Sequence, residues 1–222
     1  MRQRVANLSL ISLTVGMILM TSACAPGVSG SRASAKRAVE NLTRKPISNS
    51  PLIKRTVDSA IDQTQYTTEY DPAYTKLEYP GGDVPRERGV CADVVVRAFR
   101  SAGVDLQKEI HEDMAQHFAS YPNKWGARKP DSNIDHRRVP NLMTFFDRKG
   151  KSIQITNKAP DYFPGDVVAW ELDNHLLHIG LVTDALAAGT QNYLIVHNIG
   201  AGARIEDVLM EWKIIGHYRM WN

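Results

Sequence analysis

The chain has 222 residues, of which 43% are hydrophobic, 23% charged and 8% aromatic. This composition is typical of a globular protein that buries one core. The formal net charge is +3, and it falls to +1 when Arg2 and Arg4 are removed with the segment that we expect to be cleaved. So small a charge argues against nucleic acid as a partner.

Residues 1–23 predict an export signal. Arg2 and Arg4 form a basic start, residues 8–20 are an apolar run, and residues 21–23 supply small side chains at a cleavage site. The apolar run is too short for a membrane span, which needs about 20 residues.

Cys24 directly follows the predicted cleavage site and resembles the lipid-acceptor cysteine of a bacterial lipoprotein. Thr21 stands where that motif usually carries Leu, whereas Pro26 would hinder ordinary cleavage after Ala25. We predict that Cys24 is lipidated and that the protein is a membrane-anchored lipoprotein in the periplasm. The alternative is simple secretion, with Cys24 removed or left free.

The rest of the chain divides into a tether and one domain. Residues 24–51 are rich in Ser, Ala, Asn, Lys and Pro, which predicts a flexible, lipid-anchored tether. Residues 52–222 contain no internal repeats and predict a single domain.

Within the domain, Tyr-, Pro- and Gly-rich residues 66–85 predict an extended segment and a turn. The run that begins at Cys91 is apolar nearly all round and is closed by Gly103, so we expect a central, buried helix. Another helix is bracketed by Pro140 and Gly150. The predicted helices lie near residues 52–61, 91–102, 106–118 and 140–149.

Strand-like runs follow the last predicted helix, and turn residues separate them. They cover residues 166–172, 178–183, 193–198 and 216–221. Helices first and strands later is the order of an α+β domain.

Cys91 is the only thiol of the mature chain if Cys24 carries lipid or is lost. An unpaired thiol in an oxidising compartment is open to oxidation, and one interpretation of Cys91 is a buried, inert residue. Its place in the first turn of a helix supports the other interpretation. The free amide groups and the positive end of the helix dipole favour a thiolate there.

A thiolate nucleophile needs a base, and the base needs an orienting polar residue. His178 begins one predicted strand and His197 ends the next, so strand pairing is expected to place them side by side. Alternation puts Gly180 on the same face as His178, and we expect it to leave room for the helix terminus that carries Cys91.

These residues also carry a family resemblance, in the segments 88–91, 164–168, 178–182 and 195–197. Their types and order resemble the NlpC-type cell-wall peptidases, which have a papain-like fold. The resemblance implies Cys91 as nucleophile, His178 as base and His197 as third residue. Asn198 is the alternative, in a Cys-His-Asn arrangement of the papain kind. One departure is that Ala92-Asp93 stand where that family has Ser-Gly.

The chain more closely resembles a family of exported bacterial domains of unknown function, family 1287, which is grouped with that superfamily. This resemblance covers nearly all of the predicted domain. It rests on the segments 111–114, 133–142, 196–200 and 216–219.

Asp135, His136, Arg137 and Arg138 form a charged run beside Pro140. A solvated face is one interpretation of such a run. The other is a substrate-binding site, because a guanidinium held next to a proline-capped helix can grip a carboxylate. The tyrosines of residues 66–79 leave two interpretations in the same way, the floor of a groove or packing.

A zinc site formed by His175, His178 and His197 is not expected, because residues three apart in a strand point to opposite faces. The sequence predicts no metal and no cofactor.

The sequence thus predicts one α+β domain of papain-like, NlpC-type fold, with helices, including a central Cys-bearing helix, packed on an antiparallel sheet. We expect an exported cysteine hydrolase that cleaves an amide bond in peptidoglycan through a thioester. The wall is the abundant amide polymer outside the membrane, and the resembling peptidases cut it. Two alternatives remain: an amidase or acyltransferase acting on another envelope molecule, and a non-catalytic wall-binding module on the same fold.

Overall fold

The computed structural model describes residues 41–45 and 50–221. The predicted signal segment (residues 1–23), the predicted lipid-acceptor Cys24 and most of the predicted tether lie outside these ranges. Within them, no helix is both long and apolar enough to cross a membrane.

A five-stranded antiparallel sheet forms the centre of the domain, with the strand order β6-β5-β4-β3-β7. Its strands are β3 (Val167–Glu171), β4 (Leu177–Leu186), β5 (Tyr193–Asn198), β6 (Ala203–Glu206) and β7 (Lys213–Tyr218). Strands β3 to β6 follow one another across the sheet, and β7 returns to pair with β3. A separate parallel pair consists of β1 (Glu69–Tyr70) and β2 (Arg88–Gly89).

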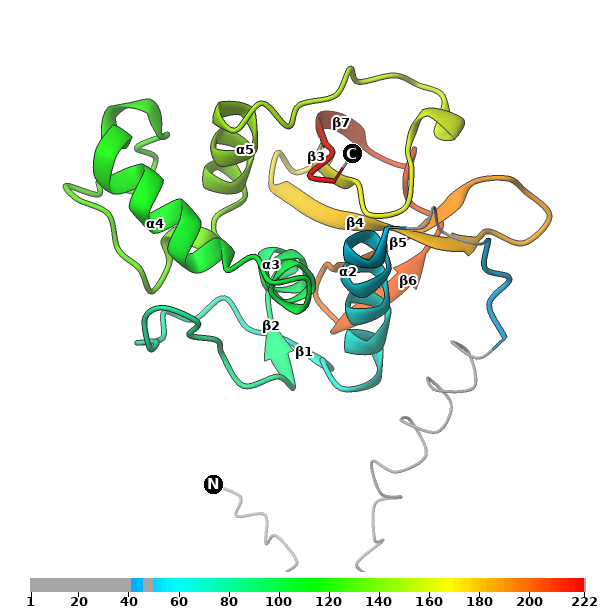
Figure 1. Ribbon diagram of the computed structural model, residues 1–222, viewed down its shortest axis with the longest axis horizontal. Coiled ribbons are helices and arrows are strands. Elements are labelled where there is room, and N and C mark those ends of the chain that lie inside the picture. Colours follow the sequence, from blue (N-terminus) through cyan, green and yellow to red (C-terminus); the bar gives the residue numbers. More distant parts are fainter. Residues whose placement is uncertain (1–40, 46–49, 222) are drawn as a thin grey trace, which may run out of the picture.

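Four α-helices lie in the described part of the chain: α2 (Pro51–Asp62), α3 (Cys91–Ser101), α4 (Leu106–His117) and α5 (Val139–Arg148). Helices α2 and α3 lie side by side against β4, and α4 and α5 stand together at the other end of the domain (Figure 1). Every residue of α3 from Cys91 to Phe99 is buried. The predicted central, buried helix is therefore confirmed.

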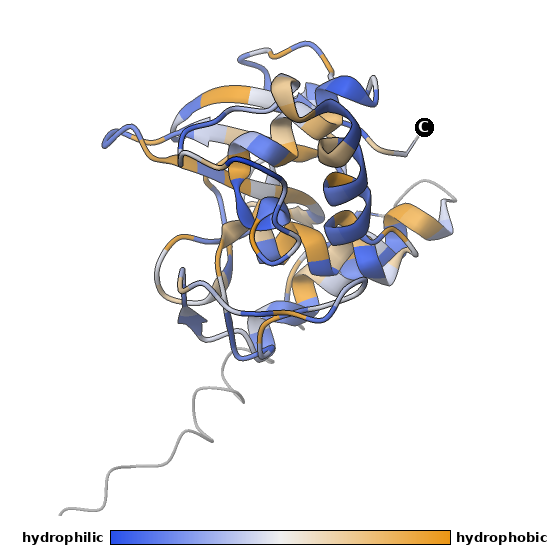
Figure 2. Cartoon of the chain, turned by 90° about the vertical axis from the view of Figure 1, so that its left-hand side faces the viewer, coloured by the Kyte–Doolittle hydropathy of each residue, from blue (hydrophilic) through white to orange (hydrophobic). Residues whose placement is uncertain are grey.

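Alternation along β4 separates two packed layers. Ile179 and Leu181 point to the face covered by α2 and α3, and they join the core cluster that contains Cys91. Val182 points to the opposite face, where it packs with Trp170 of β3. We call the first the helix face and the second the far face. Hydrophobic and hydrophilic segments alternate along the helices in Figure 2, as expected for helices with one buried side.

The structure confirms the α+β class, with helices before strands. The four predicted helices agree with the observed ones to within one or two residues. The last strand is Lys213–Tyr218 rather than residues 216–221. The sequence does not predict β6, because Ala203 and Ile205 alone give too short an alternation to stand out from a turn.

The described part of the predicted tether lies against β4. The amide of Leu186 donates a hydrogen bond of 2.9 Å to the carbonyl of Thr43. The guanidinium of Arg44 contacts the carboxylates of Asp184 at 2.7 Å and Asp58 at 2.6 Å. The contacts of the domain thus begin before the predicted boundary at residue 52.

Gly180 is needed for close packing between β4 and β5. A Cβ atom there would lie 2.8 Å from Cγ2 of Ile195 and 3.1 Å from Cβ of His197, both on the far face. The expectation that Gly180 leaves room for the helix terminus of Cys91 is wrong, because α3 lies on the helix face. The missing side chain instead lets His197 approach β4.

Candidate active site

Cys91 is the first residue of α3, as the sequence predicts. The carboxylate of Asp93 accepts a hydrogen bond of 2.7 Å from the amide of Val90, the residue before the helix. An acidic side chain in the first turn satisfies an otherwise unpaired amide and complements the positive end of the helix dipole. The thiol is therefore held at a fixed helix start, and Cys91 is only 5% exposed.

Burial raises the pKa of the Cys91 thiol to about 11. The amide groups of Ile179, Cys91 and Ala92 oppose this shift by favouring the thiolate, so the expected effect of the helix start is present but outweighed. Because Ile179 belongs to β4, the sulfur lies beside the residue that follows His178. A thiol with a raised pKa is protonated at neutral pH, and Cys91 needs a base before it can act as a nucleophile.

His178, His197 and Glu206 form a hydrogen-bonded chain on three adjacent strands. Nε2 of His178 lies 2.9 Å from Nδ1 of His197, and Nε2 of His197 lies 2.9 Å from Oε2 of Glu206. With Glu206 ionised, its oxygen accepts from Nε2 of His197, so Nδ1 of His197 accepts from Nε2 of His178. This arrangement leaves Nδ1 of His178 unprotonated, with its lone pair available for another proton.

This chain lies on the far face of the sheet. The ring of His178 stacks on Trp170 at 5.9 Å between centroids and meets the edge of Trp212 at 5.8 Å. Burial lowers the pKa of His178 to about 3, with a further contribution from His197. The structure brings together the two predicted histidines. It gives no hydrogen bond between His178 and the thiol of Cys91 within the described ranges.

Asn198, the alternative third residue, points to the helix face. Its Nδ2 donates to the carbonyls of Gly89 at 2.9 Å and Glu69 at 3.2 Å, and the side chain is fully buried. Asn198 therefore ties the small β1–β2 pair to the sheet. The residue that the structure places against His178 is His197.

Arg137 and Asp93 form a buried ion pair, with Nε of Arg137 3.0 Å from Oδ1 of Asp93. Arg137 also donates to the carbonyls of Ala73 and Asp71, both at 2.9 Å. Its guanidinium is thus occupied by the fold. The structure contradicts the expectation that Arg137 is free to bind a substrate carboxylate.

Asp135 and His136 are buried as well, at 1% and 2% exposure. Asp135 accepts the amide of Asp131 at 2.6 Å and lies 3.5 Å from Nδ1 of His111. Burial lowers the pKa of His136 to about 4. These positions fit neither a solvated face nor direct substrate binding, because the turn Asp135–Arg137 packs against α3, α4 and α5.

Arg137 and Arg138 both line one pocket. Of the two, only Arg138 has a guanidinium that donates no hydrogen bond to the described part of the chain. The pocket has a volume of about 600 Å³ and is lined by Cys91, Tyr70, Tyr74 and Trp125, among others. Burial raises the pKa of the Tyr70 phenol, and a thiolate at Cys91 would raise it further. The groove-floor interpretation thus fits Tyr70 and Tyr74.

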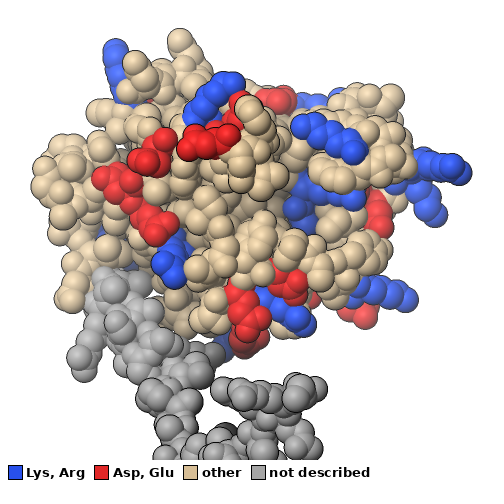
Figure 3. Space-filling model, turned by 180° about the vertical axis from the view of Figure 1, so that it is seen from behind, with Lys and Arg blue, Asp and Glu red and all other residues tan. Residues whose placement is uncertain are grey.

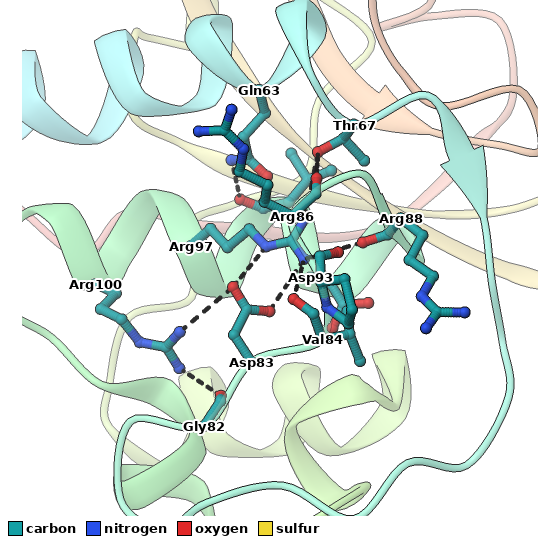
Figure 4. A network of polar contacts seen from close by, with 12 residues as sticks. Gln63, Thr67, Gly82, Asp83, Val84, Arg86, Arg88, Asp93, Arg97 and Arg100 are labelled. Atoms are coloured by element: carbon teal, nitrogen blue, oxygen red, sulfur yellow. Dashed lines mark hydrogen bonds and ion pairs between the residues drawn. The ribbon is translucent and has the colours of Figure 1, made fainter.

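A second buried arginine, Arg97, holds the loop ahead of α3 (Figure 4). Its guanidinium donates to the carboxylate of Asp83 at 2.8 Å and to the carbonyl of Arg88 at 2.9 Å. Arg100 donates to the carbonyl of Gly82 at 3.0 Å. These bonds fix the loop against α3 and so fix the start of the helix.

The part of the chain that the structure describes holds no group of three or more His, Cys, Asp or Glu side chains arranged to bind a metal ion. The polar side chains around Cys91 and His178 are held by one another and by the backbone. Their arrangement offers proton transfer and nucleophilic attack as its chemistry.

The family described as "Domain of unknown function (DUF1287)" matches residues 57–220. The chain belongs to this family. The uncharacterized protein YijF of Escherichia coli (strain K12) is 60% identical over 163 residues, which cover 73% of this chain and 78% of YijF. The predicted resemblance to family 1287 is therefore confirmed.

The sequence does not indicate two residues of this candidate site. Glu206 extends the histidine pair by its hydrogen bond to His197. In the strand ladder His197 pairs with Arg204, and Glu206, two residues further along β6, lies on the same face. A prediction of strand β6 would therefore have indicated Glu206. Trp125 lies in an irregular loop, where no sequence pattern indicates that it reaches the pocket.

Replacing Arg137 in this DUF1287 domain tests its structural role. Arg137→Leu should lower the free energy of unfolding by about 3–5 kcal/mol, because Asp93 is left as a buried, unpaired charge. Arg138→Ala is the matched control, and it should lose at most about 1 kcal/mol, the stacking of its guanidinium on Trp125. Urea unfolding measures both, and equal stability of the two variants would contradict the role given to Arg137.

Proposed function

We propose that this DUF1287 protein is a cysteine hydrolase of papain-like fold, related to the NlpC-type peptidases, with Cys91 as nucleophile. One observation carries the proposal. Cys91, at the start of α3, lines a pocket, and its thiol lies at the backbone amide of Ile179 in β4. The residue before Ile179 is His178, which begins the hydrogen-bonded chain His178–His197–Glu206. A nucleophile, a base and groups that orient the base are the parts that such catalysis needs.

In this mechanism, Nδ1 of His178 takes the proton of the Cys91 thiol. The resulting imidazolium is stabilised by Glu206 through His197. The sulfur attacks the amide carbonyl, a thioester forms, and the proton passes to the leaving amine. Water then attacks the thioester, which releases the acid and restores the thiol.

The proposal requires Nδ1 of His178 and the thiol to come within hydrogen-bond distance when substrate binds. The pairing of β4 with β5 ends at Leu181 and Val196, and the thiol lies at the amide of Ile179, beyond that last pair. Catalytic hydrogen bonds often tighten only in the substrate complex. On its other edge β4 stays paired with β3, with Trp170 opposite His178, so only the edge that faces β5 is open to such an adjustment.

We propose peptidoglycan as the substrate, and an envelope location with a lipid anchor at Cys24, because the sequence predicts export. An amidase or acyltransferase on another envelope molecule would use the same residues. On the face seen in Figure 3, basic and acidic side chains share the surface, so that face offers no broad basic area for a nucleic-acid backbone.

A second candidate, a non-catalytic wall-binding module, is favoured by two features. The pKa of the thiol is raised to about 11, and the ring of His178 is on the far face of the sheet. Both features suit an inert, buried cysteine.

Digestion of purified wall fragments tests the hydrolase directly. Cys91→Ala and His178→Ala should each abolish the products seen by mass spectrometry, and the double variant should be little worse, because the pair acts as a unit. His197→Ala should be less severe, because it orients the base. Circular dichroism confirms folding, and a folded Cys91→Ala variant with full activity would end the proposal.

The pH dependence of alkylation separates the two candidates. With burial alone, a pKa of about 11 leaves a thiolate fraction of only about 10⁻⁴ at pH 7, and labelling by iodoacetamide rises about tenfold per pH unit up to that pKa. If His178 takes the proton when a ligand binds, Cys91 should be labelled near pH 7 in the presence of wall fragments, and His178→Ala should slow this labelling at least tenfold. Identical pH profiles for the wild type and His178→Ala would favour the binding module.

Glu206→Gln tests the end of the proton chain. Loss of the carboxylate charge should lower kcat about tenfold or more with little change in KM, because it removes stabilisation of the imidazolium rather than a substrate contact. Asp207→Asn is the control, since it removes the neighbouring, exposed charge. Equal kinetics of the two variants would exclude Glu206 from the mechanism.

A further inference from the structure

The pocket at Cys91 is lined by cationic side chains and by no carboxylate of the described chain. Lys124, Arg137 and Arg138 reach it, but the charge of Arg137 is cancelled by Asp93. The positive charges of Lys124 and Arg138 have no carboxylate opposite them on the pocket wall. An anionic group of a ligand can provide this negative charge.

Arg138 is the best placed of these cations. Its backbone precedes α5, and its carbonyl accepts the amide of Asn141 at 2.9 Å, so the residue is held at a helix start. Its guanidinium carbon lies 4.1 Å from the centre of the Trp125 ring. Stacking of this kind covers the flat face of a guanidinium and leaves the donors on its edge free.

No acceptor in the described ranges takes those donors. The carboxylate of Asp131 interacts electrostatically with Arg138. Its oxygens already accept hydrogen bonds from the hydroxyl of Tyr74 at 3.0 Å and from the side-chain and backbone nitrogens of Asn133 at 2.8 and 3.0 Å. Arg138 therefore differs from its neighbour Arg137, each of whose three guanidinium nitrogens donates to the protein.

We propose that Arg138, held on Trp125, binds a free carboxylate of the peptide whose amide bond Cys91 attacks. The carboxylate would accept two parallel hydrogen bonds from the edge of the guanidinium. The attack on the amide rests on the proposed function, whereas the carboxylate contact rests on the pocket alone. The substrate class is thus a peptide with a free carboxylate close to the cleaved bond, as wall stem peptides have.

The test measures binding in the Cys91→Ala background, where no cleavage occurs. Two synthetic stem peptides are titrated by calorimetry, identical except that one carries a free carboxylate and the other its amide. The acid form should bind about tenfold more tightly, a difference of about 1.4 kcal/mol. Arg138→Ala should remove this preference by weakening the acid form alone.

Three further variants sharpen the result. Arg138→Lys should keep part of the preference, because it retains the charge without the paired donors. Trp125→Ala should weaken the acid form several-fold, since the guanidinium loses its support. Arg128→Ala should change nothing, because it removes an exposed positive charge from the same loop without reaching the pocket.

Equal binding of the two peptides, or equal loss for both in Arg138→Ala, would overturn the inference. So would failure of the acid form to bind. Selective binding of the acid form by a protein that does not digest wall fragments would instead reject the hydrolase and leave the carboxylate site in place.

Discussion

The ion pair between Asp93 and Arg137 is almost removed from water, and the site is arranged around it. On one side, Asp93 also accepts the amide of Val90 and so fixes the start of α3, where the thiol lies. On the other side, Arg137 holds the carbonyls of the segment that carries Tyr70. A pair of this kind contributes little net stability relative to an apolar replacement, but either partner alone would be a buried charge. The main effect of the Asp93–Arg137 pair is therefore to hold the start of α3 and the segment that carries Tyr70 in fixed positions relative to each other.

Local patterns predicted the elements of this fold well, since each depends on residues close in the chain. Cys91 at a helix start and the pairing of His178 with His197 follow from capping and strand alternation. Alternation shows that His178 and Gly180 share a face, but it cannot show which face the helices cover. That choice depends on packing between α3 and β4, which are far apart in the sequence.

The charged run shows the opposite situation. Four polar residues in a row are typical of a solvated surface, and three of them are buried. The partners of Arg137 lie far away along the chain, at Asp93 and at the carbonyls of Asp71 and Ala73, so no local pattern indicates them. Only Arg138 keeps the freedom that the sequence suggested for the whole run.

The sheet separates the two halves of the proposed chemistry. The thiol belongs to the helix face, and the proton chain belongs to the far face, shielded by Trp170 and Trp212. Burial keeps both groups neutral at rest, and a buried, protonated thiol is oxidised less readily than an exposed thiolate. An enzyme built in this way would react only when a ligand in the pocket draws the thiol and the imidazole together.

Residues 43–45 dock on β4, so the chain before residue 43 would limit the reach of the domain if it were anchored. Thr43 follows Cys24 by nineteen residues. A fully extended chain of that length spans at most about 65 Å. If Cys24 carries lipid, this distance limits how far Thr43 can lie from the membrane surface, and the pocket can lie farther out by no more than the size of the domain.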